Sequence, residues 1–112
     1  MDAEPGKPFD LKLRENALVK GERLEVTFEQ LITDSRCPIG VQCIRAGEAV
    51  VSVALEKTPA EKESYRLATA GRQPRTARYQ GLTVRLEDVK PYPREGVTMK
   101  PEDYRVTLVV ER

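Results

Sequence analysis

Histidine and tryptophan are absent from this 112-residue chain, which has only two cysteines and six aromatic residues. Without histidine it lacks the side chain that most often serves as a general base or a metal ligand. No serine stands in a nucleophile-elbow context, and no glycine-rich phosphate loop follows a strand. We therefore expect a protein that is not an enzyme and that binds no metal or cofactor. Carboxylates are abundant, so a mechanism built on a pair of them stays open.

The chain also lacks an excess of charge of either sign and has no long apolar run. The 19 basic and 18 acidic residues give a net charge of +1, so no global field attracts nucleic acid, which is not an expected partner. No segment approaches the roughly 18 to 20 apolar residues of a membrane span, and none near Met1 resembles a signal peptide. The protein is expected to be exported, with its signal already removed, or alternatively cytoplasmic. Residues 1–8 read as a flexible lead-in to a single domain at 9–112.

What the chain does contain is apolar residues at every second position, the period of a half-buried strand. This pattern predicts strands at 9–13, 24–28, 64–69, 82–86 and 104–110, with a short apolar run at 17–19. Residues 49–55 are apolar on both faces and predict an interior strand, with a hairpin loop at 57–63. Loops are expected at 70–81 and 90–101. Six to seven mostly antiparallel strands favour an all-β, single-domain sandwich or a partly open barrel.

Two of these strands share one pattern. Residues 24–31 and 82–89 both alternate, and then break register at a Glu-polar pair before the next apolar residue. A β-bulge would produce such a break. Either two core strands share the pattern by chance, or they are equivalent strands of two facing sheets.

The two cysteines stand in the segment 33–49, between two predicted strands. A disulfide between Cys37 and Cys43 would close a short ring and remove about 2.4 kcal/mol of unfolded-chain freedom. Free thiols are the main alternative. Zinc would need further ligands that the chain does not offer at the required spacing, and the spacing is too long for a redox pair. A disulfide would fit an exported protein.

The segment also carries turn formers that we expect to hold the loop. Asp34 and Ser35 begin turns by bonding to nearby amides, and Arg36 can reach Asp34, Glu48 or loop carbonyls. Gly47 is expected to supply a positive φ or a close approach of two backbones. Either these residues only hold the loop, or the loop displays a binding surface. The full set predicted to structure the loop is Asp34, Ser35, Arg36, Pro38, Gly40, Gly47 and Glu48.

The motif Asp-Ser-Arg-Cys-Pro at 34–38, Val-x-Cys at 41–43 and Ala-Gly at 46–47 resembles a pattern in uncharacterised bacterial secreted proteins and lipoproteins. The likeness extends to a downstream strand, a proline-rich connection and a terminal strand led by tyrosine. The resemblance implies an exported all-β domain, secreted or periplasmic, and implies no particular activity. Arg45 stands where that pattern has an aromatic residue, so the contact that the aromatic makes is altered here.

An arginine-rich, acid-free region covers residues 64–86. Arginines interleaved with tyrosines on a β surface can bind phosphates, single strands or another anionic polymer; Arg72, Arg75 and Arg78 are the candidates for such an anion site. The sequence is therefore consistent with three functions. The first is a non-catalytic exported module that binds a protein or the cell envelope through its loops. The second is an inhibitor-like or ligand-capture protein with rigid loops, and the third is anion or nucleic-acid binding between Arg66 and Arg85.

Overall fold

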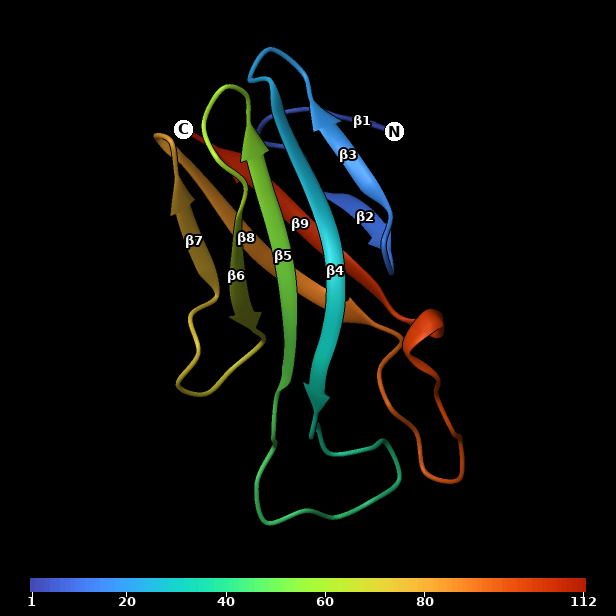
Figure 1. The fold of residues 1–112 in the computed structure, drawn as a ribbon. Helices are drawn as coiled ribbons and strands as arrows, with labels where there is room; N and C mark the ends of the chain where they lie inside the picture. The colour runs from blue at the N-terminus through green and yellow to red at the C-terminus, as the bar shows by residue number, and fades with distance from the viewer.

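The computed structural model describes all 112 residues and consists of strands and one short 3₁₀ turn, η1. Two sheets face each other (Figure 1), with five strands in the order β1-β3-β4-β5-β6 and four in the order β2-β9-β8-β7. Every neighbouring pair is antiparallel except β1 and β3. The first sheet contains β1 (Asp2–Ala3), β3 (Asn16–Val19), β4 (Leu24–Asp34), β5 (Ala49–Lys57) and β6 (Glu63–Ala68). The second contains β2 (Phe9–Lys12), β7 (Thr76–Tyr79), β8 (Leu82–Lys90) and β9 (Arg105–Glu111), and η1 (Pro101–Asp103) precedes β9.

The all-β prediction is confirmed, but the expected count of six to seven strands is wrong because the chain forms nine. The two additional strands are β7, which lies within the expected loop 70–81, and β1, which lies within the expected lead-in 1–8. β1 has only two residues, and the four residues of β7 stand between Pro74 and Gly81, which favoured a loop. Ala3 of β1 is nevertheless buried, with 3% of its surface exposed, because β1 covers the edge of β3.

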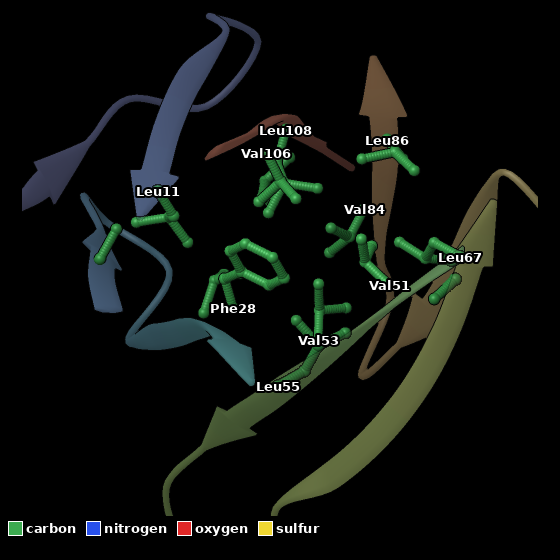
Figure 2. Packing of buried hydrophobic residues seen from close by; sticks show 14 of the residues in the cluster. Leu11, Phe28, Val51, Val53, Leu55, Leu67, Val84, Leu86, Val106 and Leu108 are labelled. Atoms are coloured by element: carbon green, nitrogen blue, oxygen red, sulfur yellow. The ribbon is translucent and has the colours of Figure 1, made fainter. Parts of the chain in front are cut away.

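The core lies between the sheets and is built from the alternating aliphatic positions of their strands. Phe28 of β4 is fully buried and lies among side chains of both sheets in Figure 2, with Val106 and Leu108 of β9 above it in that view. Fully burying one such side chain contributes roughly 1.5–3 kcal/mol. A core of this kind explains how a chain with few aromatic residues forms two stable layers.

The two sheets repeat one arrangement. Each sheet contains four strands in which every neighbouring pair is antiparallel. These are β3, β4, β5 and β6 in the first sheet, and β7, β8, β9 and β2 in the second. In β4 the register shifts after Phe28, which leaves Glu29 unpaired, and in β8 it shifts after Leu86, which leaves Glu87 unpaired. The bulge predicted from the repeated pattern is therefore confirmed in both strands, and these strands lie in facing sheets. Each is followed by a long loop at the same end of the molecule (Figure 1).

Candidate functional site

Two loops of equal length dominate the end of the molecule opposite the chain termini (Figure 1). The cysteine loop, residues 35–48, joins β4 to β5, and the proline loop, residues 91–104, joins β8 to β9. An isolated parallel bridge pairs Ile39 with Arg94. The Ile39 amide donates to the Pro93 carbonyl and the Glu95 amide donates to the Ile39 carbonyl, both at 2.9 Å. The two loops, one from each sheet, therefore form one joined structure.

Arg36 is the side chain that holds this structure together, with only 6% of its surface exposed. Its guanidinium donates two hydrogen bonds of 2.8 Å to the Asp34 carboxylate, in the bidentate geometry that favours arginine. It also donates to the carbonyls of Val89 at 2.6 Å and Pro91 at 3.1 Å, which belong to the other sheet and its loop. Its charge lies 5.0 Å from the centre of the Tyr92 ring. Arg36 reaches Asp34 and carbonyls as predicted, but the carbonyls belong to the proline-loop side.

Tyr104, at the end of the proline loop, completes this buried cluster. Its hydroxyl donates to the Asp34 carboxylate at 2.8 Å. Burial alone raises the pKa of Asp34, but the hydrogen bonds from Arg36 and Tyr104 outweigh it and hold that pKa below its ordinary value. Burial and the adjacent Asp34 charge raise the pKa of Tyr104 to about 12. The carboxylate, the guanidinium and the neutral phenol therefore stabilise one another across the two loops.

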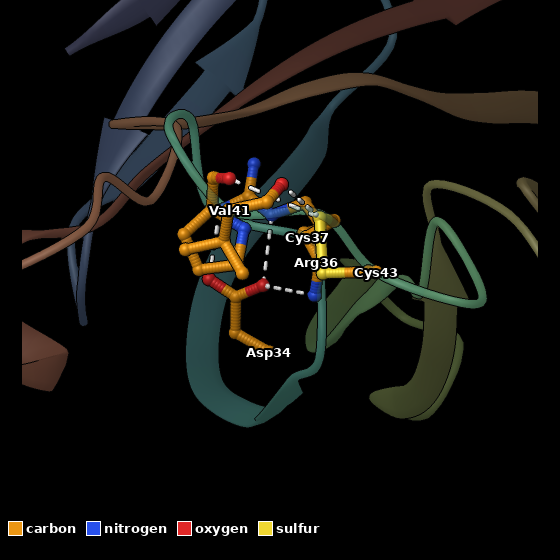
Figure 3. The surroundings of a disulfide bond; sticks show 6 residues. Asp34, Arg36, Cys37, Val41 and Cys43 are labelled. Atoms are coloured by element: carbon orange, nitrogen blue, oxygen red, sulfur yellow. Dashed lines mark hydrogen bonds and ion pairs between the residues drawn. A yellow bond between two sulfur atoms is a disulfide. The ribbon is translucent and has the colours of Figure 1, made fainter.

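The predicted disulfide is present between Cys37 and Cys43, whose Cα atoms lie 5.9 Å apart. Figure 3 shows it beside the Asp34–Arg36 pair. Within the ring the Val41 amide donates to the Pro38 carbonyl at 3.1 Å, and Gly40 has a φ of 97°. Only glycine adopts such a φ without strain, so Pro38 and Gly40 form a tight turn at the bridged part of the loop.

The base of the cysteine loop is closed by a short ladder. The Ser35 amide donates to the Glu48 carbonyl at 2.8 Å, and the Glu48 amide donates to the Ser35 hydroxyl at 3.1 Å. Gly47 has a φ of 71°, and a Cβ on it would overlap the Ser35 carbonyl. Both expectations for Gly47, a positive φ and a close approach, are confirmed. The side chain of Glu48 contacts Gly71, so the cysteine loop also touches the connection between β6 and β7.

The structure leaves apolar side chains exposed on the same two loops. Ile44 is fully exposed, and Ile39 and Val97 expose 50% and 59% of their surface. Seven large hydrophobic residues of the chain are exposed, and five belong to these loops: Ile39, Val41, Ile44, Tyr92 and Val97. Scattered apolar residues on a surface need no explanation, but a concentration at one end indicates an interaction site. Sequence patterns did not reveal this concentration, because an isolated Ile or Val in a loop looks like a core residue.

Arg45 lies next to Ile44 and is exposed. Arg45 forms no ion pair within the chain. Residue 45 is therefore part of the exposed surface of the cysteine loop.

The arginine-rich region lies away from these loops' tips, on β6, β7, their connection and the first half of β8. Arg75 uses its guanidinium internally, donating to the carbonyls of Leu86, Thr69 and Glu87. Arg78 donates to the Thr83 hydroxyl at 3.3 Å, whereas Arg72 is exposed. The three predicted anion-binding residues are thus near one another in the chain but have different roles, and only two of them keep a guanidinium free of carbonyl partners.

One surface pocket of about 540 Å³ is present, lined mostly by polar residues. It lies beside β2 and η1, and its walls are Lys12, Leu13, Arg14, Pro101 and Glu102. It contains neither the disulfide nor the Arg36 cluster. The pocket touches only the last part of the proline loop, and the exposed apolar side chains of the two loops lie outside it.

Comparison with known proteins adds no relative: no protein-family model, no curated protein and no solved structure matches the chain. Its only helix is the three-residue turn η1, and no helical segment has the length and hydropathy needed to span a bilayer.

Proposed function

We propose that this chain is a non-catalytic, exported domain that binds a protein partner through the cysteine loop and the proline loop. The observation that carries the proposal is the concentration of exposed apolar side chains on two loops, which are joined by hydrogen bonds from the buried Arg36. Apolar side chains at a surface gain free energy when a partner covers them. The disulfide supports an oxidising compartment, because such bridges persist outside the reducing cytosol.

Rigidity supports the inhibitor-like form of this function, in which stiff loops enter a cleft of the partner. The two loops lie at the same end and are bridged by Ile39 and Arg94. Loops that are ordered before binding avoid a cost of roughly 0.5–1.5 kcal/mol for each side chain immobilised in the complex. The termini lie at the opposite end (Figure 1), so the loops are free to project toward a partner.

Site-specific photo-crosslinking in cells of the native host tests the proposal. A photoreactive amino acid at position 44 should yield a crosslinked protein of defined mass, and the same group at Leu18 should not. Leu18 is the matched control because it is 50% exposed and lies on β3, away from the loops. Excess wild-type protein should compete for this product, whereas the double variant Ile44→Ser/Val97→Ser should not. The same product from both positions, or none from position 44, would contradict loop-mediated binding.

The compartment is tested separately. Protein isolated from its host without reductant should show no reactive thiol, because Cys37 and Cys43 are bridged. Two titratable thiols per chain would contradict export without contradicting binding through the loops.

A further inference from the structure

One side of the sandwich ends in two strand edges that lie alongside each other. β6 is the last strand of the five-stranded sheet and β7 is the last strand of the four-stranded sheet (Figure 1). The Tyr65 ring meets the Tyr79 ring edge-on, with centroids 6.4 Å apart. The Tyr65 hydroxyl donates to the Glu63 carboxylate at 2.6 Å and also lies 3.4 Å from the Arg78 carbonyl oxygen. These two tyrosines fill the space between the edges.

The outward-facing backbone groups of β6 can be assigned from one hydrogen bond. The Ala68 amide donates to the Pro74 carbonyl at 2.9 Å, so it points away from β5. In an antiparallel strand the amide and carbonyl groups alternate between the two sides. Ser64 and Arg66 therefore also direct their N–H and C=O groups away from β5, where the sheet has no further strand. Pro74 protects one end of the edge and leaves these two residues available.

β7 is covered differently. Its neighbour Arg75 accepts a hydrogen bond from the Leu86 amide, which places the groups of Thr76 and Arg78 on the outer side. The Arg78 carbonyl is already opposite the Tyr65 hydroxyl. β6 is consequently the more open of the two edges.

The charge along the β6 edge is acidic at its first residue, Glu63, which accepts a hydrogen bond of 2.6 Å from the Tyr65 hydroxyl, and is basic beyond it. Residues 64–86 include no acidic side chain. Arg85 is neutralised by Glu87 and Glu111, each at 2.8 Å. Arg66 and Arg78 form no ion pair within the chain, although the whole chain carries a net charge of only +1.

We propose that β6 is a second binding site, at which an extended acidic segment of a protein partner adds as a further strand. Its backbone would pair with the free groups of Ser64 and Arg66, the recognition mode known as β-augmentation. Acidic side chains of the segment would lie on the outer face, beside Arg66. Alternate side chains would lie on the inner face, beside Tyr65 and Leu67, and should be apolar. The partner sequence is thus an alternation of acidic and apolar residues.

A second copy of the chain fits this edge poorly. Two β6 edges paired with each other would bring the Arg66 guanidinium of each copy toward the other, and like charges across a strand pair are destabilising. The same arginine would attract a carboxylate. The edge is therefore guarded against self-association and remains open to an acidic strand.

Fluorescence anisotropy with a labelled synthetic peptide tests the proposal. The probe contains three glutamates alternating with valines, and a second peptide of the same sequence carries N-methyl groups that block one edge of its backbone. The wild-type protein should bind the first peptide at least tenfold more tightly than the second. Arg66→Glu and Ser64→Pro should each weaken binding of the first peptide at least tenfold. Proline is suitable at position 64 because it removes only the outward N–H of that residue, which bonds to no other strand of the sheet.

Arg45→Glu is the charge-matched control, since it makes the same reversal at the loop end, and it should leave peptide affinity unchanged. Ile44→Ser/Val97→Ser should also leave it unchanged, which separates this site from the loop-mediated function. On binding, the amides of Ser64 and Arg66 should become protected from hydrogen exchange. Equal affinity for the N-methylated peptide, for heparin or for polyphosphate would overturn strand addition. Unaltered exchange at Ser64 and Arg66 would do the same, even if Ser64→Pro fails to fold.

Discussion

Replacing Arg36 by methionine should separate the two loops and destabilise the whole domain. Methionine keeps an unbranched apolar stem but donates no hydrogen bond. It would leave the Asp34 carboxylate, whose side chain is only 7% exposed, without its cationic partner. The carbonyls of Val89 and Pro91 would lose a donor as well. Removing one partner of a buried ion pair costs about 3–5 kcal/mol. We expect about 3 kcal/mol, because the cluster lies at the end of the sandwich, near water.

Urea unfolding followed by far-ultraviolet circular dichroism measures this loss of the free energy of unfolding. Arg36→Lys keeps the charge but not the bidentate geometry, so it should cost less than Arg36→Met. Combining Arg36→Met with Asp34→Asn should cost less than the sum of the two single variants, because the second change removes the unpaired charge that the first leaves behind. Additive losses would show that the two side chains do not act as a pair.

Hydrogen exchange gives the local result that a general loss of stability would not. In Arg36→Met the amides of Ile39 and Glu95, which form the bridge between the loops, should exchange faster by more than the global loss predicts. The exchange rates of amides in β5 and β9 should rise only as much as the loss in the global free energy of unfolding predicts. If the Ile39 and Glu95 amides keep their relative protection, Arg36 does not join the loops and the reasoning fails.

Three further predictions concern the same region. The double variant Cys37→Ser/Cys43→Ser should lose about 2.4 kcal/mol in urea unfolding, because the unfolded chain regains the freedom of the ring; no loss would contradict the entropic argument. Tyr104 has a folded pKa raised to about 12, so its contribution is complete below pH 10 and is lost as pH rises from 10 to 12; Tyr104→Phe should remove that part of the alkaline stability profile. Gly47→Ala should cost several times as much as Gly21→Ala in thermal unfolding, because both have a positive φ but only residue 47 faces a neighbouring carbonyl.

The main strands could be predicted from the sequence because burial of one face repeats at every second residue. The bulges at Glu29 and Glu87 could also be predicted, since an inserted residue shifts the phase of that repeat. β7 could not, because its two buried positions are Ala77 and Tyr79 and not the Phe, Leu or Val that marks the equally short β2 and β3. Its neighbouring glycine and proline instead suggested a loop.

Only the local contacts of the candidate site could be predicted from the sequence. Asp34 and Arg36 are two residues apart, so their pairing follows from local turn chemistry. The carbonyl of Val89 comes from the other sheet and the hydroxyl of Tyr104 from the proline loop, 53 and 70 positions away along the chain from their partners. Nothing local distinguishes Tyr104 from any tyrosine that begins a strand. These contacts depend on which strand ends the fold brings to the same end of the sandwich.

The cysteine loop and the proline loop occupy equivalent places in the two sheets, yet different chemistry stiffens them. The disulfide closes the first loop, and fixed φ angles restrict the second at Pro91, Pro93 and Pro101. Each device orders only its own loop, and the contacts of Arg36 make the two loops one body. A binding surface formed by both loops should therefore lose affinity in Arg36→Met, although no exposed apolar residue changes and the disulfide stays intact. This loss of affinity would measure how much the ordering of the two loops before binding contributes to the free energy of binding.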